Sequence, residues 1–282
     1  MELPPCNFRP VFSIHRASAG TNLYRSNAID DGTVKSAKWL RETIGINSYV
    51  DLREGNEFHP MSKLGDYFIQ TKLNKPIKNP PGNFGRRYHM GFITVSYHWN
   101  LLIHKLKFNQ IFVLIFLLIQ HLIYRDYAYQ KYGGQCYLST LSLGEFYASL
   151  LDDCQKVFKQ IFTTMTDPDN FPMIICCSFG KDRTGIVVAL LLKLVGWDDE
   201  DIIKEYTKSE GNLDSLKDEI RSFFEFKGAG EEYCHAPRSA MVTMLAHLKE
   251  KYGTVENYLK SCGINEGQIE QIKTNIMKLQ FL

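Results

Sequence analysis

A cysteine and an arginine six positions apart, Cys177 and Arg183, are the residues whose types and spacing best fit a chemical role. The residues that precede them, Met173 to Cys176, are apolar or carry a thiol and predict a short buried strand. After them, Thr184 opens the aliphatic run Ile186 to Leu192, which predicts a helix. The pattern therefore predicts a strand, a tight loop and a helix within about twenty residues.

We call residues 177–184 the cradle loop. A loop at a helix N-terminus points backbone N–H groups inward, and the helix dipole adds partial positive charge, so it can bind an oxyanion such as phosphate. The same field lowers the pKa of a thiol, which makes Cys177 a candidate nucleophile. Arg183 carries a planar fork of donors that can hold two phosphoryl oxygens.

The remaining residues of the cradle loop suit the same role. Gly180 permits the backbone dihedrals of a tight loop, and Thr184 can donate a hydrogen bond to the thiolate when it becomes a leaving group. Lys181 would add positive charge for an anionic substrate, unless it is an ordinary solvated lysine. The residues expected to bind phosphate are Ser178, Phe179, Gly180, Lys181, Asp182, Arg183 and Thr184.

Two carboxylates compete for the role of general acid, which protonates the departing oxygen. Asp182 lies inside the cradle loop, and Asp51 comes near the end of the predicted strand Ile46 to Leu52. Asp182 could alternatively brace the loop. Asp51 could instead form a structural ion pair or hydrogen bond with Arg25 or with the segment Asn7 to Arg9. The residues alone leave this choice open.

The segment Cys177-Ser-Phe-Gly-Lys-Asp-Arg-Thr-Gly185 resembles the active-site loop of the protein-tyrosine-phosphatase superfamily. It looks most like the branch of atypical tyrosine phosphatases whose loop reads Cys-x-x-Gly-Lys-Asp-Arg-Thr-Gly. Further resemblances follow in the order of that branch: Asn7-Phe-Arg9, Leu23-Tyr-Arg-Ser26, Gly45-Ile-Asn-Ser-Tyr-Val-Asp-Leu-Arg53 and Tyr252-Gly-Thr-Val-Glu-Asn-Tyr-Leu259. The match is poor between about Phe84 and Gln135.

The resemblance implies a cysteine-phosphatase fold, a phosphocysteine intermediate, and Asp182 in the role of general acid. The chain departs from the family at Cys176, where the family usually has a histidine that helps to organise the loop. A transient disulfide between Cys176 and Cys177 is one hypothesis for this position, although bonds between adjacent cysteines are strained. A small thiol packed at a strand end is the simpler interpretation.

The 282 residues, of which 44% are hydrophobic, are enough for a single phosphatase domain over residues 1–282. A predicted strand at Asn22 to Ser26, a helix at Thr33 to Ile44 and the strand at Ile46 to Leu52 favour a parallel sheet. We therefore expect an α/β fold in which a mostly parallel central sheet is flanked by helices. A helical insertion or lid is expected at about residues 84–135, and a helical cap at the C-terminus.

Other elements are expected from periodicity and from breaker residues. The segment from Phe108 to Tyr124 has no formally charged residue, is too short to favour a membrane span, and predicts a buried helix or part of a lid. The pattern also predicts a strand over residues 67–73. Further helices are predicted over residues 141–165, 198–207, 213–226, 239–252, 255–262 and 266–277.

The formal net charge of +2 gives no reason to expect nucleic acid or a polybasic membrane anchor, because such partners need clustered charge. The N-terminus lacks the sections of a signal peptide, which favours a cytoplasmic setting. Seven cysteines without framework spacing favour free thiols. We expect no metal site and no cofactor, since protein donors can carry the charge stabilisation.

The sequence thus predicts a cysteine-dependent phosphomonoester hydrolase, foremost a protein tyrosine or dual-specificity phosphatase. One alternative is a phosphoinositide phosphatase, because Lys181 is compatible with a polyanionic head group. Another is a pseudophosphatase that binds phosphate without turnover. The expected partners are a phosphorylated protein or a phospholipid substrate.

Overall fold

The computed structural model describes residues 4–12, 22–29, 34–54, 57, 63–73, 75, 77–78, 80–92, 107–124, 132 and 138–277. Over these residues the chain forms a six-stranded sheet in the order β1-β2-β6-β3-β5-β4. Every neighbouring pair is parallel except β1 and β2, which are antiparallel. The strands are β1 (Arg9–Pro10), β2 (Leu23–Asn27), β3 (Ser48–Asp51), β4 (Phe68–Gln70), β5 (Gly85–His89) and β6 (Met173–Cys177). The predicted mostly parallel sheet is confirmed.

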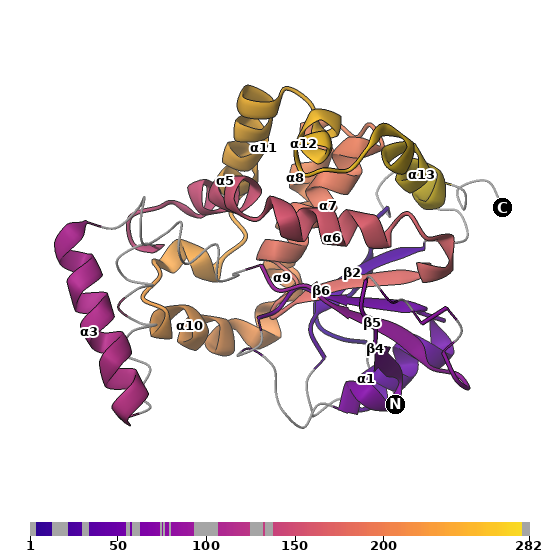
Figure 1. Ribbon diagram of the computed structural model, residues 1–282, viewed down its shortest axis with the longest axis horizontal. Helices are drawn as coiled ribbons and strands as arrows, with labels where there is room; N and C mark the ends of the chain where they lie inside the picture. Colours follow the sequence, from indigo (N-terminus) through magenta and orange to yellow (C-terminus); the bar gives the residue numbers. More distant parts are fainter. Residues whose placement is uncertain are drawn as a thin grey trace.

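The central strand β6 is buried on both faces, which is why its sequence is an unbroken apolar run rather than an alternation. Ile175 and Cys177 point into the larger core, whereas Ile174 and Cys176 point into the smaller one. In Figure 1 the sheet lies between two layers of helices. The helix α1 (Val34–Lys38) lies on one side, and α6 (Gln155–Thr164) and α7 (Asp182–Leu194) lie on the other.

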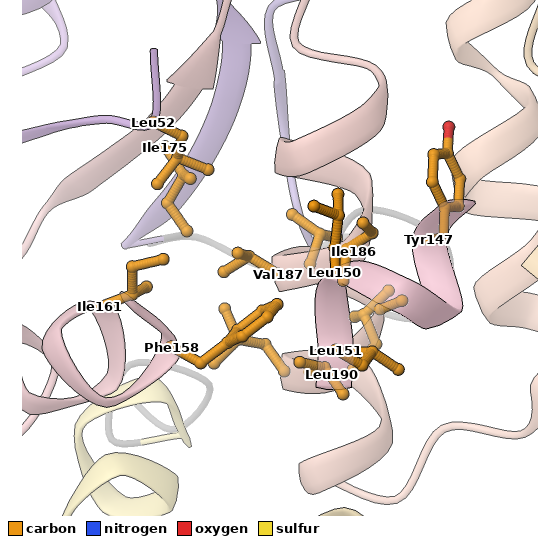
Figure 2. Close-up of a cluster of buried hydrophobic side chains, with 14 of the residues drawn as sticks. Leu52, Tyr147, Leu150, Leu151, Phe158, Ile161, Ile175, Ile186, Val187 and Leu190 are labelled. Atoms are coloured by element: carbon orange, nitrogen blue, oxygen red, sulfur yellow. The ribbon is translucent and has the colours of Figure 1, made fainter. Parts of the chain in front are cut away.

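The helices that cover the larger core include α5 (Leu143–Asp153), α6 (Gln155–Thr164) and α7 (Asp182–Leu194). The helix α7 is buried almost all round, which fits its uninterrupted run of Ile, Val, Ala and Leu. Figure 2 shows Leu150, Phe158 and Val187 of these helices in one cluster with Ile175 of β6 and with Leu52, which follows β3. This packing fixes α7 against β6, and with it the loop that joins them.

The smaller core is built by α1 and by the π-helix η1 (Trp39–Thr43), which follows it directly. Ala37 and Leu40 from these helices pack with Ile174 and Tyr49 of the sheet. The predicted helix over residues 33–44 is therefore present, and it stops as expected at Gly45, where φ is +79°. The predicted acidic start at Asp30 or Asp31 lies outside the described residues.

The expectation of one long helix over residues 141–165 is wrong. The chain forms α5 and α6, which are separated at Cys154, where φ is −110° and ψ is 23°. The Cys154 thiol donates to the carbonyl of Phe92 at 3.2 Å. Both helices bury their apolar stripe in the same core, so the spacing of apolar residues continues from α5 into α6. The break between the two helices therefore cannot be seen in this spacing.

The predicted helical cap is confirmed by helices that follow α7. They are α8 (Asp199–Thr207), α9 (Ser209–Asn212), η5 (Asp214–Leu216), α10 (Lys217–Phe226), η6 (Glu231–Cys234), α11 (Arg238–Tyr252), α12 (Val255–Ser261) and α13 (Glu266–Met277). The expected helix at 213–226 is thus divided into η5 and α10. The expected strand at 67–73 is shorter, as β4, after the 3₁₀ helix η3 (Lys63–Asp66).

The segment expected to be a helical insertion, about 84–135, contains both sheet and helix. Its first residues form β5, which pairs with β3 and β4 inside the sheet. Residues 93–106, 125–131 and 133–137 lie outside the described part of the chain. Any insertion therefore begins after β5.

The apolar helix α3 (Phe108–Tyr124) has the predicted bounds, and Figure 1 shows it at the left edge of the molecule. The expectation that it is buried is wrong, because Phe108, Phe116 and Leu122 are 77%, 65% and 75% exposed. Among the described helices, none combines the length and apolar character needed to cross a membrane. A lid function for α3 stays a prediction.

Candidate active site

The cradle loop joins the end of β6 at Cys177 to the first turn of α7, which begins at Asp182. Gly180 sits at the bend with φ +64°, and its N–H donates to the Cys177 carbonyl at 3.2 Å. A Cβ on Gly180 would lie 2.2 Å from the carbonyl oxygen of Ser26. Only glycine fits there, because both the left-handed backbone and the neighbouring strand exclude a side chain.

The carbonyl groups of the cradle loop are held from behind by two side chains near the N-terminus. Asn7 Nδ2 donates to the carbonyls of Phe179 at 3.2 Å and Gly180 at 3.0 Å, and Arg25 donates to Gly180 at 2.7 Å. In a trans peptide the N–H points opposite to the C=O, so the Lys181 N–H points away from these donors. The Lys181 N–H can therefore face an anion, whereas the Gly180 N–H is bonded within the loop.

The two braces belong to a buried ionic cluster. Glu205 of α8 accepts from Arg9 at 2.6 Å and from Arg25 at 2.5 Å, and Arg9 also donates to Asn7 Oδ1. Burial, followed by the charge of Arg25, lowers the pKa of Arg9 to about 10. Asn7 itself has φ +55°, a conformation that asparagine tolerates better than most residues. The cluster connects the N-terminal segment to the cradle loop and to α8.

Cys177 and Arg183 lie at the two ends of the cradle loop. Cys177 is 1% exposed. The Arg183 guanidinium donates to the Leu52 carbonyl at 3.3 Å and to Ser178 Oγ at 3.1 Å. The Thr184 hydroxyl is buried and has no hydrogen-bond partner among the described residues, so it is free to bond a leaving thiolate.

Glu57 completes the environment of Arg183, and no motif in the sequence indicated this residue. Its carboxylate accepts from Arg183 at 2.5 and 2.9 Å and from Ser178 Oγ at 3.0 Å. Burial would raise the pKa of Glu57, but the charge of Arg183 and its hydrogen bonds lower it to about 2. Glu54 lies 3.8 Å from the same guanidinium. A bound phosphate must therefore take over some of the Arg183 contacts.

Asp182 is fixed by two donors, Tyr147 and Lys181, and the sequence indicated neither contact. Tyr147 Oη donates to Asp182 Oδ1 at 2.6 Å, and Lys181 Nζ lies 2.9 Å from the same oxygen. Tyr147 is itself hydrogen-bonded to Tyr206 at 2.8 Å. Figure 2 shows the Tyr147 hydroxyl projecting away from the other labelled side chains of the core. Both donors contact the same carboxylate oxygen, Oδ1.

The Lys181 side chain is directed into the protein and is 1% exposed. Its ammonium donates to the carbonyls of Tyr233 at 2.8 Å and His235 at 2.6 Å, besides contacting Asp182. Neither of the two roles weighed for it, a substrate-binding charge or a solvated lysine, matches this position. Its backbone N–H remains part of the cradle loop.

Asp51 is fully buried at the end of β3. It accepts two hydrogen bonds from the Arg53 guanidinium, both at 3.0 Å, one from the Arg53 backbone N–H at 3.2 Å, and one from Arg87 at 2.9 Å. Burial opposes ionisation, but these two guanidinium groups lower the pKa of Asp51. The structure therefore gives Asp51 ionic partners, as the alternative reading foresaw, but they are Arg53 and Arg87 rather than Arg25 or the segment Asn7 to Arg9.

Cys176 and Cys177 point to opposite faces of β6. The Cys176 thiol donates to the Val50 carbonyl at 3.5 Å, and burial raises its pKa well above the ordinary value. This geometry is unfavourable for a bond between the two sulfurs and agrees with the simpler interpretation of a packed thiol.

Within the described residues, no group of three or more His, Cys, Asp and Glu side chains is arranged to hold a metal ion. The cysteines of this part of the chain are free: Cys6, Cys154, Cys176, Cys177, Cys234 and Cys262. Cys136 lies outside it.

Comparison with known proteins adds an independent finding. A family model described as "Tyrosine phosphatase family" matches residues 7–278. The chain is similar to a tyrosine-protein phosphatase of Nostoc commune, with 31% identity over 144 residues, which cover 48% of this chain and 49% of that protein. It is also similar to the triple specificity protein phosphatase PtpB of Mycobacterium tuberculosis, with 27% identity over 124 residues, which cover 36% and 42%.

The chain spans about half the length of these curated relatives, or somewhat less. Among solved structures, the core catalytic domain of the PP-IP phosphatase SIW14 from S. cerevisiae covers 92% of this chain, and this chain covers 98% of that domain. The TM-score is 0.40 and the sequence identity is 17%.

Proposed function

Because the chain belongs to the tyrosine phosphatase family, we propose that it is a cysteine-dependent phosphatase of phosphate monoesters, with phosphotyrosine in proteins as its main substrate class. The observation that carries this proposal is the cradle loop. Cys177 and Arg183 stand at its two ends, and its carbonyls are held from behind by Asn7 and Arg25. The reaction requires a reduced thiol, which fits a cytoplasmic setting.

In the first step the Cys177 thiolate attacks the phosphorus atom in line with the ester oxygen. The S–P bond forms as the P–O ester bond breaks, and the departing phenol oxygen receives a proton. Arg183 and the N–H groups of the cradle loop hold the equatorial oxygens, where charge is redistributed in the transition state. No charge has to be supplied by a cofactor, because these donors carry it.

In the second step a water molecule attacks the phosphocysteine. The new P–O bond forms as the S–P bond breaks, the Asp182 carboxylate accepts a proton from the water, and inorganic phosphate leaves. The Thr184 hydroxyl, which has no partner in the described part of the chain, then donates to the departing thiolate. This contact lowers the cost of expelling a sulfur anion into a buried site.

We assign proton transfer to Asp182, which Tyr147 and Lys181 hold at one carboxylate oxygen. Asp51 is a weaker candidate, because Arg53 and Arg87 stabilise its ionised form and it is fully buried. If Asp182 is the acid, Asp182→Asn should slow hydrolysis of an alkyl phosphate at least tenfold more than that of an activated aryl phosphate. Equal slowing of both substrates would contradict the assignment, and Asp51→Asn provides the comparison.

The central test compares the wild type with Cys177→Ser on p-nitrophenyl phosphate and on phosphotyrosine and phosphoserine peptides. We expect wild-type turnover with a preference for phosphotyrosine, and a loss on the order of 10³-fold or more in the variant. Acid quenching should trap phosphate on Cys177 of the wild type alone. Phosphate binding by both proteins without wild-type turnover would instead indicate a phosphate-binding pseudophosphatase.

A further inference from the structure

A second cation, Lys227, stands beside the cradle loop, and the proposed reaction does not use it. Its ammonium lies 3.9 Å from Glu57 Oε1, and the same oxygen accepts from Arg183 at 2.9 Å. The two positive groups are therefore separated by at most about 7 Å, because both contact one carboxylate oxygen. Glu54 and Glu57 balance the charges of these two groups.

Lys227 is held in position rather than freely solvated. It is the C-cap of α10, and its N–H donates to the Phe223 carbonyl at 3.3 Å. Its ammonium lies 4.5 Å from the centre of the Phe223 ring. Phe223 in turn packs edge-on against Phe179 of the cradle loop, with ring centroids 5.3 Å apart. The side chain is 28% exposed, so it is accessible to a ligand as well.

Lys181, the other lysine near the site, is not available for this purpose. Its ammonium donates to two backbone carbonyls and contacts Asp182, and the side chain is buried. A second negative group on a substrate would therefore find its charge partner at Lys227.

We propose that Lys227 forms a second anion subsite beside the cradle loop, and that among inositol phosphate substrates it favours those with two neighbouring phosphate groups over those with one. One phosphate occupies the cradle loop, and the other replaces Glu57 as the partner of Lys227. Two phosphates on adjacent carbons of a ring, as in an inositol bisphosphate or the head group of a phosphoinositide, fall within this spacing. The inference rests on the proposed phosphatase function and names a substrate class for the same site.

The test measures kcat/KM for a short-chain phosphoinositide with two vicinal phosphates and for the matching monophosphate. The wild type should prefer the bisphosphate, and Lys227→Met should lower the ratio of the two values about tenfold, as expected for one charge-assisted hydrogen bond. Lys227→Arg should retain most of the ratio. Thermal melting of each variant confirms that it is folded, and Lys227→Gln replaces Lys227→Met if the latter does not fold.

Lys217→Met is the matched control. Lys217 lies at the other end of α10, is 64% exposed and pairs with Asp214 at 2.9 Å. Its loss removes the same charge from the same helix, and the ratio should stay within about twofold of the wild type. The free inositol bisphosphate, without acyl chains, distinguishes recognition of the two phosphates from recognition of a lipid.

An equal fall of the ratio in both lysine variants would show a general charge effect and would overturn the proposal. So would an unchanged ratio in Lys227→Met, or a Lys227 effect confined to acidic phosphopeptides. Absence of wild-type turnover on every substrate, including p-nitrophenyl phosphate, would instead refute the phosphatase function itself. The two failures are therefore distinguishable.

Discussion

Among single residues, Glu57 holds the Arg183 guanidinium, and it is the part of the site that the motif did not predict. The motif indicates Cys177 and Arg183 directly, because a nucleophile and a phosphate clamp must flank a tight loop. It does not indicate the carboxylate that fixes the plane of the Arg183 guanidinium, because Glu57 lies 126 positions away in sequence. Only the tertiary fold brings the two together.

Glu57 should also make stability depend on pH. Its pKa is lowered to about 2 in the folded protein, so its ionised form stabilises the fold above the ordinary pKa, and this stabilisation is lost as the pH falls toward 2. Glu57→Gln should therefore lower the free energy of unfolding by about 3 kcal/mol at pH 7, and by about half as much at pH 3. Urea unfolding of both proteins between pH 3 and pH 7 measures the difference.

Glu256→Gln is the control for this experiment, because that carboxylate is 37% exposed and pairs with Lys273 far from the cradle loop. Its effect should be small at every pH. If the loss of unfolding free energy in Glu57→Gln were the same from pH 3 to pH 7, Arg183 would not be stabilising the ionised Glu57 carboxylate. That result would contradict the geometry.

Among the elements, the N-terminal segment around β1 matters most for the cradle loop. It carries Asn7, whose amide holds two loop carbonyls, and Arg9, which joins Asn7 to Glu205 of α8. The loop conformation is thus imposed partly by residues about 170 positions earlier in the chain. A loop sequence alone does not determine the direction of its amides.

Asn7→Asp tests this support with little change in shape. The substitution keeps an acceptor for Arg9, but it replaces the donor to Phe179 and Gly180 with an oxygen that repels their carbonyls. We expect inorganic phosphate to inhibit the variant about tenfold more weakly than the wild type. Asn83→Asp, at an exposed position, should leave the inhibition constant within about twofold. An unchanged constant in Asn7→Asp would contradict the bracing role.

The spacing of apolar residues predicted where helices form. It did not predict whether a helix is interrupted, or whether its apolar side chains are buried. The apolar stripe of α5 continues into α6 because both face one core, so the break at Cys154 left no mark in the pattern. The run in α3 was read as buried because apolar residues usually are, yet Phe112 and Ile119 are exposed on its surface. The hydropathy of a helix indicates that its side chains favour burial, but it does not show whether another part of the chain packs against them.

Over the whole molecule, the sequence predicted the parallel sheet, the strand before the cradle loop, the helix after it and the C-terminal helical cap. These features follow from local signals: the buried run of β6, the stop at Gly196 with φ +87°, and the capping residues of the later helices. The pairings of Asp51 with Arg87, of Arg25 with Glu205 and of Tyr147 with Asp182 could not be predicted. Each joins side chains from separate elements, and local pattern carries no information about such contacts.

The Lys181 side chain links the cradle loop to the C-terminal cap. Its ammonium donates to the carbonyl of Tyr233 in η6 and to that of His235, which follows η6. Asp182 balances the charge of this ammonium, so only the two carbonyl contacts depend on the cap. Displacing η6 would leave these two donor groups unpaired in the interior, at a cost of about 1–3 kcal/mol each. The conformation of the cradle loop and the folding of the C-terminal cap are therefore coupled through one lysine.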